Sequence, residues 1–114
     1  MSRDRIYLLH IRDAIVRIEK YASHGHDAFL KETHWQDATI HQLEVIGEAT
    51  KRLSPGLKDA HPGMPWLRIA GLRDVLIHDY MGVDLATVWD VVQNRIPELK
   101  SLVLAMLEKP EPAD

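Results

Sequence analysis

The chain has 114 residues, of which 46% are hydrophobic and 27% are charged, and its formal net charge at pH 7 is −3. This length suits one domain, and the composition indicates neither a disordered chain nor a membrane protein. The acidic balance argues against a broadly basic nucleic-acid-binding surface, so any RNA or DNA would have to bind at a local patch or in a groove between two copies.

Three absences indicate in which compartment the protein works. The chain contains no cysteine, so it can form no disulfide, thiolate nucleophile or cysteine zinc site. No apolar run approaches the roughly 18 to 20 residues that a membrane-spanning helix needs. The opening segment MSRDRIYLLH also lacks the apolar core and the cleavage site of a signal peptide. We therefore expect a cytoplasmic protein.

Residues 4–22 form the first predicted helix. Their apolar side chains recur at alternating spacings of three and four residues, which places them on one helical face. Gly25 breaks this pattern, and Asp27 is expected to cap a short helical turn before Thr33. The predicted apolar face consists of Leu8, Ile11, Ile15, Ile18 and Ala22.

A second amphipathic helix is predicted from Thr33 to Leu53. Thr33 and Gln36 match a capping box, in which the two side chains satisfy backbone N–H groups of the first turn. Gly47 lies inside this helix at a cost of about 1 kcal/mol relative to alanine, which favours close packing by a neighbouring helix over close approach of a ligand. The predicted buried face consists of Leu43, Ile46, Thr50 and Leu53.

Prolines and glycines interrupt the chain between Ser54 and Pro65, where we expect a connection with one short turn. Pro65 suits the first position of the next helix, because its missing N–H would have no partner there. Gly82 should end that helix, since glycine tolerates the left-handed conformation common at helix C-termini. The apolar face of this helix would consist of Trp66, Ile69, Leu72 and Leu76.

Asp84 is expected to cap a last long helix, which Pro97 should kink or divide. Its apolar positions are Leu85, Val88, Trp89, Val92, Ile96, Leu99 and Met106. No segment shows the alternation of a strand, and there is no internal repeat. The sequence therefore predicts an all-α bundle of about four or five helices, in one domain over residues 1–109 with a frayed tail over 110–114.

The octapeptide RDVLIHDY at 73–80 places ionisable residues around three apolar ones. On a helix the Asp74 carboxylate could hold the His78 imidazole, four residues on, and raise the basicity of its other nitrogen. Arg73 suits a phosphate, because its planar guanidinium donates two hydrogen bonds and stays charged. A two-fold axis beside this helix would combine such groups from two copies. A structural interpretation is also open, since such residues are more often solvated or paired and Tyr80 could simply anchor the helix end.

Arg73, four residues, His78, one residue and Tyr80 form an Arg-x4-His-x-Tyr motif. Around it lie LEVIGEATKRLS at 43–54 and HPGMPWLRIAGLRDVLIHDYMGVDLATVWDVVQNRIPELK at 61–100. In these segments the chain resembles the HepT-like HEPN ribonucleases, the toxin halves of HEPN/MNT toxin–antitoxin pairs. The resemblance covers nearly the whole chain, and the motif is specific in this setting although weak alone.

The resemblance implies an all-helical HEPN-type fold, a homodimer and a metal-independent endoribonuclease whose site lies at the dimer interface. Arg73 and His78 would be the catalytic pair, Asp74 would orient the His78 imidazole, and the RNA product would carry a 2′,3′-cyclic phosphate. A minimal nucleotidyltransferase antitoxin would add AMP to Tyr80 and so block RNA by occupancy and charge. No metal or other cofactor is implied.

Two other functions remain open from the sequence. The chain could be a non-catalytic helical dimer that serves as partner and substrate of a nucleotidyltransferase, with Tyr80 as the AMP acceptor. It could also be a purely structural helical adaptor. If RNA is bound, basic side chains must gather locally in the dimer, and the candidates are Lys51, Arg52, Arg68 and Arg73.

Seven histidines raise the question of a metal site. His24 and His26 flank a glycine, and His34 and His41 lie seven apart on a helix, but neither pair supplies a recognised set of three or four ligands. Glu44 and Glu48 should face solvent or pair with Lys51 and Arg52. Each of the three tryptophans is expected to pack in the core, and His61 is expected in a loop.

Overall fold

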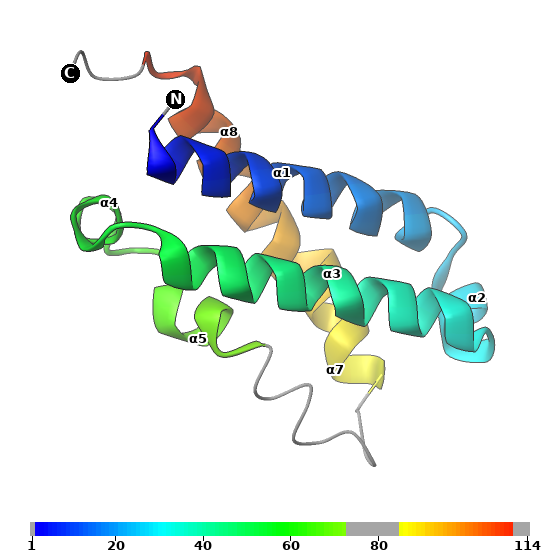
Figure 1. The fold of residues 1–114 in the computed structure, drawn as a ribbon. Helices are drawn as coiled ribbons and strands as arrows, with labels where there is room; N and C mark the ends of the chain where they lie inside the picture. Colours follow the sequence, from blue (N-terminus) through cyan, green and yellow to red (C-terminus); the bar gives the residue numbers. More distant parts are fainter. Residues whose placement is uncertain (1, 73–84, 111–114) are drawn as a thin grey trace.

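In the computed structural model, which describes residues 2–72 and 85–110, every regular element is a helix. The elements are α1 (Arg3–Ala22), α2 (His26–Lys31), α3 (Thr33–Arg52), α4 (Pro55–Asp59), α5 (Trp66–Ala70), α7 (Leu85–Asp90), a π-helical turn η1 (Val91–Arg95) and α8 (Ile96–Glu108). The predicted all-α fold is thus confirmed. Figure 1 shows α1 and α3 side by side, with α8 running diagonally behind them and α5 and α7 below α3. Within the described ranges, no helix is long and apolar enough to cross a membrane.

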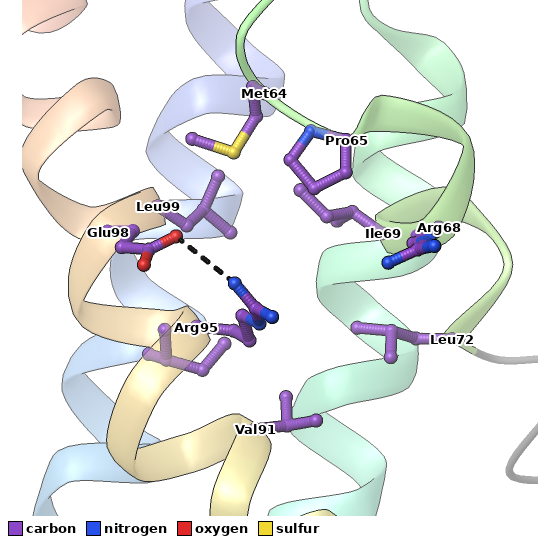
Figure 2. A pocket seen from close by; sticks show the side chains of 10 residues that line it. Met64, Pro65, Arg68, Ile69, Leu72, Val91, Arg95, Glu98 and Leu99 are labelled. Carbon is purple, nitrogen blue, oxygen red and sulfur yellow. Dashed lines mark ion pairs between the residues drawn. The ribbon is translucent and has the colours of Figure 1, made fainter.

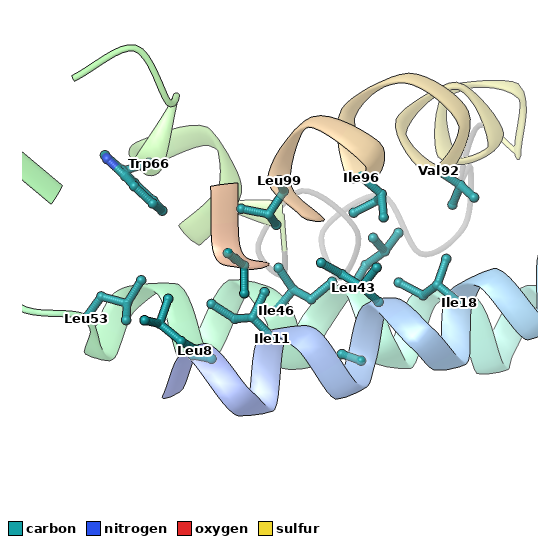
Figure 3. Packing of buried hydrophobic residues seen from close by; sticks show 14 of the residues in the cluster. Leu8, Ile11, Ile18, Leu43, Ile46, Leu53, Trp66, Val92, Ile96 and Leu99 are labelled. Atoms are coloured by element: carbon teal, nitrogen blue, oxygen red, sulfur yellow. The ribbon is translucent and has the colours of Figure 1, made fainter. Parts of the chain in front are cut away.

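The core lies between α1, α3 and α8, as Figure 3 shows. Ile11 and Ile18 of α1 and Ile46 of α3 expose none of their surface. Burying an aliphatic side chain of this size contributes roughly 1.5–3 kcal/mol, so these helices supply much of the stability. Gly47 is buried, in keeping with the close packing predicted there. The predicted apolar faces are therefore confirmed at Leu8, Ile11, Ile15, Ile18, Leu43, Ile46, Thr50, Leu53, Leu99 and Met106, and Ala22 is half-buried.

The start of α3 differs from the prediction. Thr33 is already helical, Glu32 occupies the N-cap position, and no side chain caps the helix. Gln36 instead donates from Nε2 to the carbonyl oxygens of Phe29, at 2.9 Å, and Leu30, at 3.2 Å. The predicted capping box is wrong, because the Gln36 amide satisfies carbonyl groups at the end of the preceding helix α2.

Helix α2 begins one residue earlier than its predicted cap. Gly25 occupies the N-cap position with φ of 96°, a conformation that glycine adopts without strain. Asp27 lies inside the first turn, where a negative charge still favours the N-terminus of a helix. The short helical turn before Thr33 is confirmed, and the cap at Asp27 is wrong.

The connection between Ser54 and Pro65 contains one short helix, α4, as predicted. Ser54 caps it, since the backbone N–H of Leu57 donates to Ser54 Oγ at 3.3 Å. The N–H and Oγ of Ser54 donate in turn to the Asp4 carboxylate, at 2.8 and 2.6 Å. The start of α1 is thereby joined to the end of α3.

Helix α5 is shorter than the helix predicted from Pro65 to Gly82. Pro65 precedes it as the N-cap residue, and Gly71 follows it as the C-cap residue. The Gly71 N–H donates to the Leu67 carbonyl oxygen at 2.9 Å, and a Cβ at this position would lie 3.2 Å from that oxygen. Gly71 therefore allows a tight turn that ends α5, whereas Leu76 and Gly82 lie outside the described residues.

The last helical stretch is divided, as predicted from the position of Pro97. Pro97 lies in the first turn of α8, where its missing N–H needs no partner. Upstream, the N–H of Ile96 donates to the carbonyl oxygen of Val91, five residues earlier, which is the hydrogen bond of a π-helical turn. This wider turn separates α7 from α8. The predicted cap Asp84 lies outside the described residues.

Candidate functional site

All four predicted site residues lie outside the described residues: Arg73, Asp74, His78 and Tyr80. The described residues end at Leu72, which directly precedes Arg73 in the sequence, and begin again at Leu85. The described elements that flank the motif are α5 before it and α7, η1 and α8 after it.

Trp66 fixes the position of α5. Its indole is buried, and Nε1 donates to the carbonyl oxygens of Lys58, at 3.1 Å, and His61, at 3.0 Å. A helix of five residues is not stable alone, so the burial of this indole and its hydrogen bonds to the preceding connection both help to hold it. The Trp66 anchor thus positions the chain shortly before it enters the motif. It also confirms the predicted core packing of Trp66 and the loop position of His61.

Trp89 gives α7 a comparable attachment. The His26 ring stacks on it with a centroid separation of 5.0 Å, and the Phe29 ring lies tilted at 5.2 Å. Trp89 is half-buried, although Val88 beside it is buried. Both segments that flank the motif are therefore joined to other parts of the bundle by a tryptophan. The pairing of His26 with Trp89 was not predicted, because no local pattern brings α2 and α7 together.

A pocket of about 260 Å³ opens between α5 on one side and η1 and α8 on the other. We call it the arginine pocket, since Figure 2 shows Arg68 and Arg95 among apolar side chains. Leu72, the last residue described before Arg73, contributes to its wall. The described lining consists of Met64, Pro65, Arg68, Ile69, Leu72, Val91, Arg95, Ile96, Glu98 and Leu99.

The charges of the arginine pocket suit an anion. Arg95 Nη1 lies 3.9 Å from Glu98 Oε2, and both side chains are mostly exposed, so the pair is weak. Arg68 is exposed and forms no ion pair with any residue that the structure describes. Guanidinium groups beside apolar walls can hold a phosphate ester that carries a flat apolar group.

Arg95 was missed by sequence reasoning, whereas Arg68 was among the basic candidates. Arg95 lies at the end of the π-helical turn, two residues before Pro97. A proline that interrupts a helix often accompanies a widened turn, and such turns are frequent at functional sites. That combination is the local signal that could have identified Arg95. Arg68 lines a different pocket from Lys51 and Arg52, and their gathering in a dimer stays a prediction.

The other predicted constellations have structural neighbours. His24 stacks on Trp35 at 4.2 Å and His34 lies tilted against the same ring at 4.6 Å, whereas His26 stacks on Trp89. In residues 2–72 and 85–110, no group of three or more metal-ligating side chains is placed to hold a metal ion. The predicted pairing of Glu48 with Arg52 is confirmed at 3.4 Å. Trp35 is only half-buried, so its predicted place in the core is wrong in part.

The ribonuclease HepT-like family matches residues 11–106 of the chain. A Methanocaldococcus jannaschii protein named "Gamma-glutamylcyclotransferase and putative RNase" is 41% identical over 111 residues, which are 96% of this chain and 50% of that protein. The chain thus spans about half the length of this relative. A "Putative RNase" of Caldanaerobacter subterraneus subsp. tengcongensis is 37% identical over 110 residues, covering 96% of this chain and 98% of the relative. A "Probable ribonuclease HepT" of Thermococcus cleftensis is 42% identical over 95 residues, covering 82% of this chain and 86% of the relative.

No solved structure matches the chain significantly. The family match extends from α1 into α8 and includes the Arg-x4-His-x-Tyr motif at 73–80. It therefore covers both flanking segments and the arginine pocket between them. The chain belongs to the ribonuclease HepT-like family, and this membership supports a ribonuclease function.

Proposed function

We propose that this protein is a metal-independent endoribonuclease that acts as a dimer, with Arg73 and His78 as its catalytic residues. The observation that carries the proposal is the family match over residues 11–106, which includes the complete motif at 73–80. The flanking elements support it, because the described residues on both sides of the motif, α5 and α7, are anchored to the bundle.

In the proposed reaction His78 accepts the proton of a ribose 2′-hydroxyl, whose oxygen attacks the neighbouring phosphorus. A bond forms between the 2′-oxygen and phosphorus, and the bond from phosphorus to the 5′-oxygen breaks as that oxygen takes up a proton. Arg73 donates hydrogen bonds to the phosphate oxygens, whose charge grows as phosphorus becomes five-coordinate. The products are a 2′,3′-cyclic phosphate and a 5′-hydroxyl.

Two copies of the chain can supply the groups that this reaction needs. One histidine cannot be the base and the acid in the same step, so the His78 side chains of two copies would divide these roles across a two-fold axis. Asp74, four residues before His78, would orient the imidazole through a hydrogen bond. The homodimer is thus part of the catalytic proposal.

Regulation would act on the same segment. A minimal nucleotidyltransferase antitoxin would transfer AMP from a nucleoside triphosphate to Tyr80: the phenolic oxygen bonds to the α-phosphorus and pyrophosphate leaves. The added phosphate is negative and bulky and lies two residues from His78, so it would exclude RNA by charge and occupancy. The protein would then be the toxin of a toxin–antitoxin pair.

Cleavage of labelled single-stranded RNA and transfer RNA in excess EDTA tests the catalytic part. We expect cyclic-phosphate ends from the wild-type dimer and none from His78→Ala. His41→Ala is the matched control, since His41 is an exposed histidine on α3 and should leave cleavage unchanged. Cleavage that requires a divalent ion, or that survives in His78→Ala, would contradict the proposal.

Intact-mass measurement tests the regulatory part. Protein produced together with its nucleotidyltransferase should gain the mass of one or more AMP groups, and Tyr80→Phe should gain none. If the AMP-free dimer cleaves no RNA while Tyr80 still accepts AMP, the chain is the non-catalytic partner and substrate of the transferase instead.

A further inference from the structure

A second opening lies on the other side of α5 from the arginine pocket. It joins two adjacent cavities, of about 440 and 710 Å³, that share Lys51 and Pro55 in their walls. We call their union the basic groove. Figure 1 shows that its elements, the start of α1, the end of α3, α4 and α5, lie at one end of the bundle. The described lining consists of Ser2, Arg3, Asp4, Lys51, Arg52, Leu53, Ser54, Pro55, Lys58, Asp59, Pro62, Trp66, Leu67, Ala70 and Gly71.

The basic groove is positively charged although the chain as a whole carries −3. Four cationic side chains line it, against the carboxylates of Asp4 and Asp59. Asp4 already accepts two hydrogen bonds from Ser54. Arg52 lies within 3.4 Å of Glu48, whereas the remaining cations form no ion pair with any residue in the described ranges: Arg3, Lys51 and Lys58. These charges are therefore available to an anionic ligand.

The larger of the two cavities also offers apolar contact. Leu67 exposes 90% of its surface, and Pro62, which is also exposed, lines the same cavity. Exposed apolar groups beside a row of cations suit single-stranded nucleic acid, whose phosphates need charge and whose unpaired bases need apolar neighbours. Gly71, which ends α5, lines the groove, and Arg73 follows it by two residues in the sequence.

We propose that the basic groove binds the sugar–phosphate backbone of single-stranded RNA and carries it towards the end of α5. The inference rests on the proposed ribonuclease function, for which it names the path of the substrate. Lys51 occupies the middle of this path, because it lines both cavities. Lys58 is held towards α3 by donating from Nζ to the Thr50 carbonyl oxygen at 3.4 Å. The two lysines would each contact a phosphate.

Binding of a 2′-O-methyl RNA oligonucleotide to the intact protein tests the groove, because this RNA lacks the hydroxyl needed for cleavage. The double variant Lys51→Gln/Lys58→Gln should bind roughly ten-fold more weakly at low salt. The slope of log affinity against log salt should fall by about 1.4, since each lost phosphate contact on a single strand accounts for about 0.7. Lys51→Arg/Lys58→Arg keeps both charges and should bind like wild type.

A matched control removes two lysines at the opposite end of the bundle. Lys20 and Lys31 are exposed on α1 and α2, so Lys20→Gln/Lys31→Gln changes the net charge equally. This control variant should lower RNA affinity less than about two-fold, which is the effect expected from the change in net charge alone. Equal weakening of the two double variants, or no weakening in either, would overturn the inference. In the second case an acidic protein surface would become the ligand to seek.

Failure of the groove and failure of the catalytic proposal have different signatures. A protein that binds 2′-O-methyl RNA through Lys51 and Lys58 but leaves unmodified RNA intact supports the groove and contradicts catalysis. A protein that cleaves RNA while Lys51→Gln/Lys58→Gln binds like wild type supports catalysis and overturns the groove.

Discussion

The long helices α1 and α3 differ from the short helices α5 and α7 in what they bury. Each long helix has 20 residues and a continuous buried face, whereas α5 and α7 have five and six residues and bury one side chain each, Trp66 and Val88. The long helices therefore form a stable frame. The short ones depend on attachments to that frame and leave openings on both sides of α5.

This division separates stability from binding within one small domain. The frame rests on the buried apolar residues of α1 and α3, while the openings proposed to bind ligands carry exposed or partly exposed cations around α5. Substitutions in the frame should lower the free energy of unfolding, and substitutions around α5 should act more weakly on it. The predictions below test that ranking, from the largest effect to the smallest.

Truncation in the frame should have the largest effect. Ile15→Ala on α1 removes three carbon atoms from a side chain that exposes 1% of its surface, and should lower the free energy of unfolding by about 2–5 kcal/mol. Val16→Ala is the control, since Val16 exposes 41%. Urea unfolding followed by circular dichroism measures both. If Ile15→Ala lowered the free energy of unfolding less than Val16→Ala, the buried face of α1 would not be the source of the frame's stability.

Trp66→Phe tests the attachment of α5. It removes the Nε1 donor shared by the Lys58 and His61 carbonyl oxygens and should cost about 1–3 kcal/mol. In Trp66→Phe, hydrogen exchange should speed up relative to wild type more at the Gly71 amide, which closes α5, than at amides in the middle of α3. Trp35→Phe is the matched change at a half-buried tryptophan. Uniformly faster exchange would mean that α5 and the frame are one cooperative unit.

Ser54→Ala tests the link between the frame and α4. It removes the cap on Leu57 N–H and the hydrogen bond from Oγ to Asp4, at an expected cost of about 1 kcal/mol. Ser101→Ala, at an exposed position on α8, should cost less than about 0.5 kcal/mol. Thermal unfolding of the two variants should give a lower melting temperature for Ser54→Ala than for Ser101→Ala. Equal melting temperatures would show that the Ser54 cap contributes nothing to stability.

The ion pair between Lys100 and Glu19 should have the smallest effect. Its atoms are 2.9 Å apart and it joins α8 to α1, but both side chains are partly exposed. A double-mutant cycle with Lys100→Gln and Glu19→Gln should give a coupling of about 0.2–1 kcal/mol that falls with added salt. A coupling insensitive to salt would mean that the pair is better shielded from water than its exposure indicates.

The frame was predictable because its signal is local. Apolar residues at spacings of three and four specify one buried face whatever packs against it. Every residue predicted for these two faces is therefore buried except Ala22, which is half-buried. The predicted division of the last helix near Pro97 is correct for a similar reason, because a missing backbone N–H interrupts a helix in any surroundings.

The errors arose where a distant partner decided the outcome. Gln36 bonds to carbonyl groups of the separate helix α2 instead of completing a cap on its own helix. The arginine pocket depends on Arg68 and Arg95 meeting across separate elements, which spacing along the chain cannot reveal. The roles of Arg73, Asp74, His78 and Tyr80 stay predictions from the motif, because these residues lie outside the described ranges.

The cleavage rate of His78→Ala in excess EDTA tests the central claim most directly, measured on protein whose folded state is verified by circular dichroism. If His78 transfers the proton at the reacting phosphate, the variant should cleave single-stranded RNA about 10²–10⁴-fold more slowly than wild type while unfolding cooperatively. Cleavage at the wild-type rate, with the same cyclic-phosphate ends, would contradict the assignment of His78 and with it the proposed site.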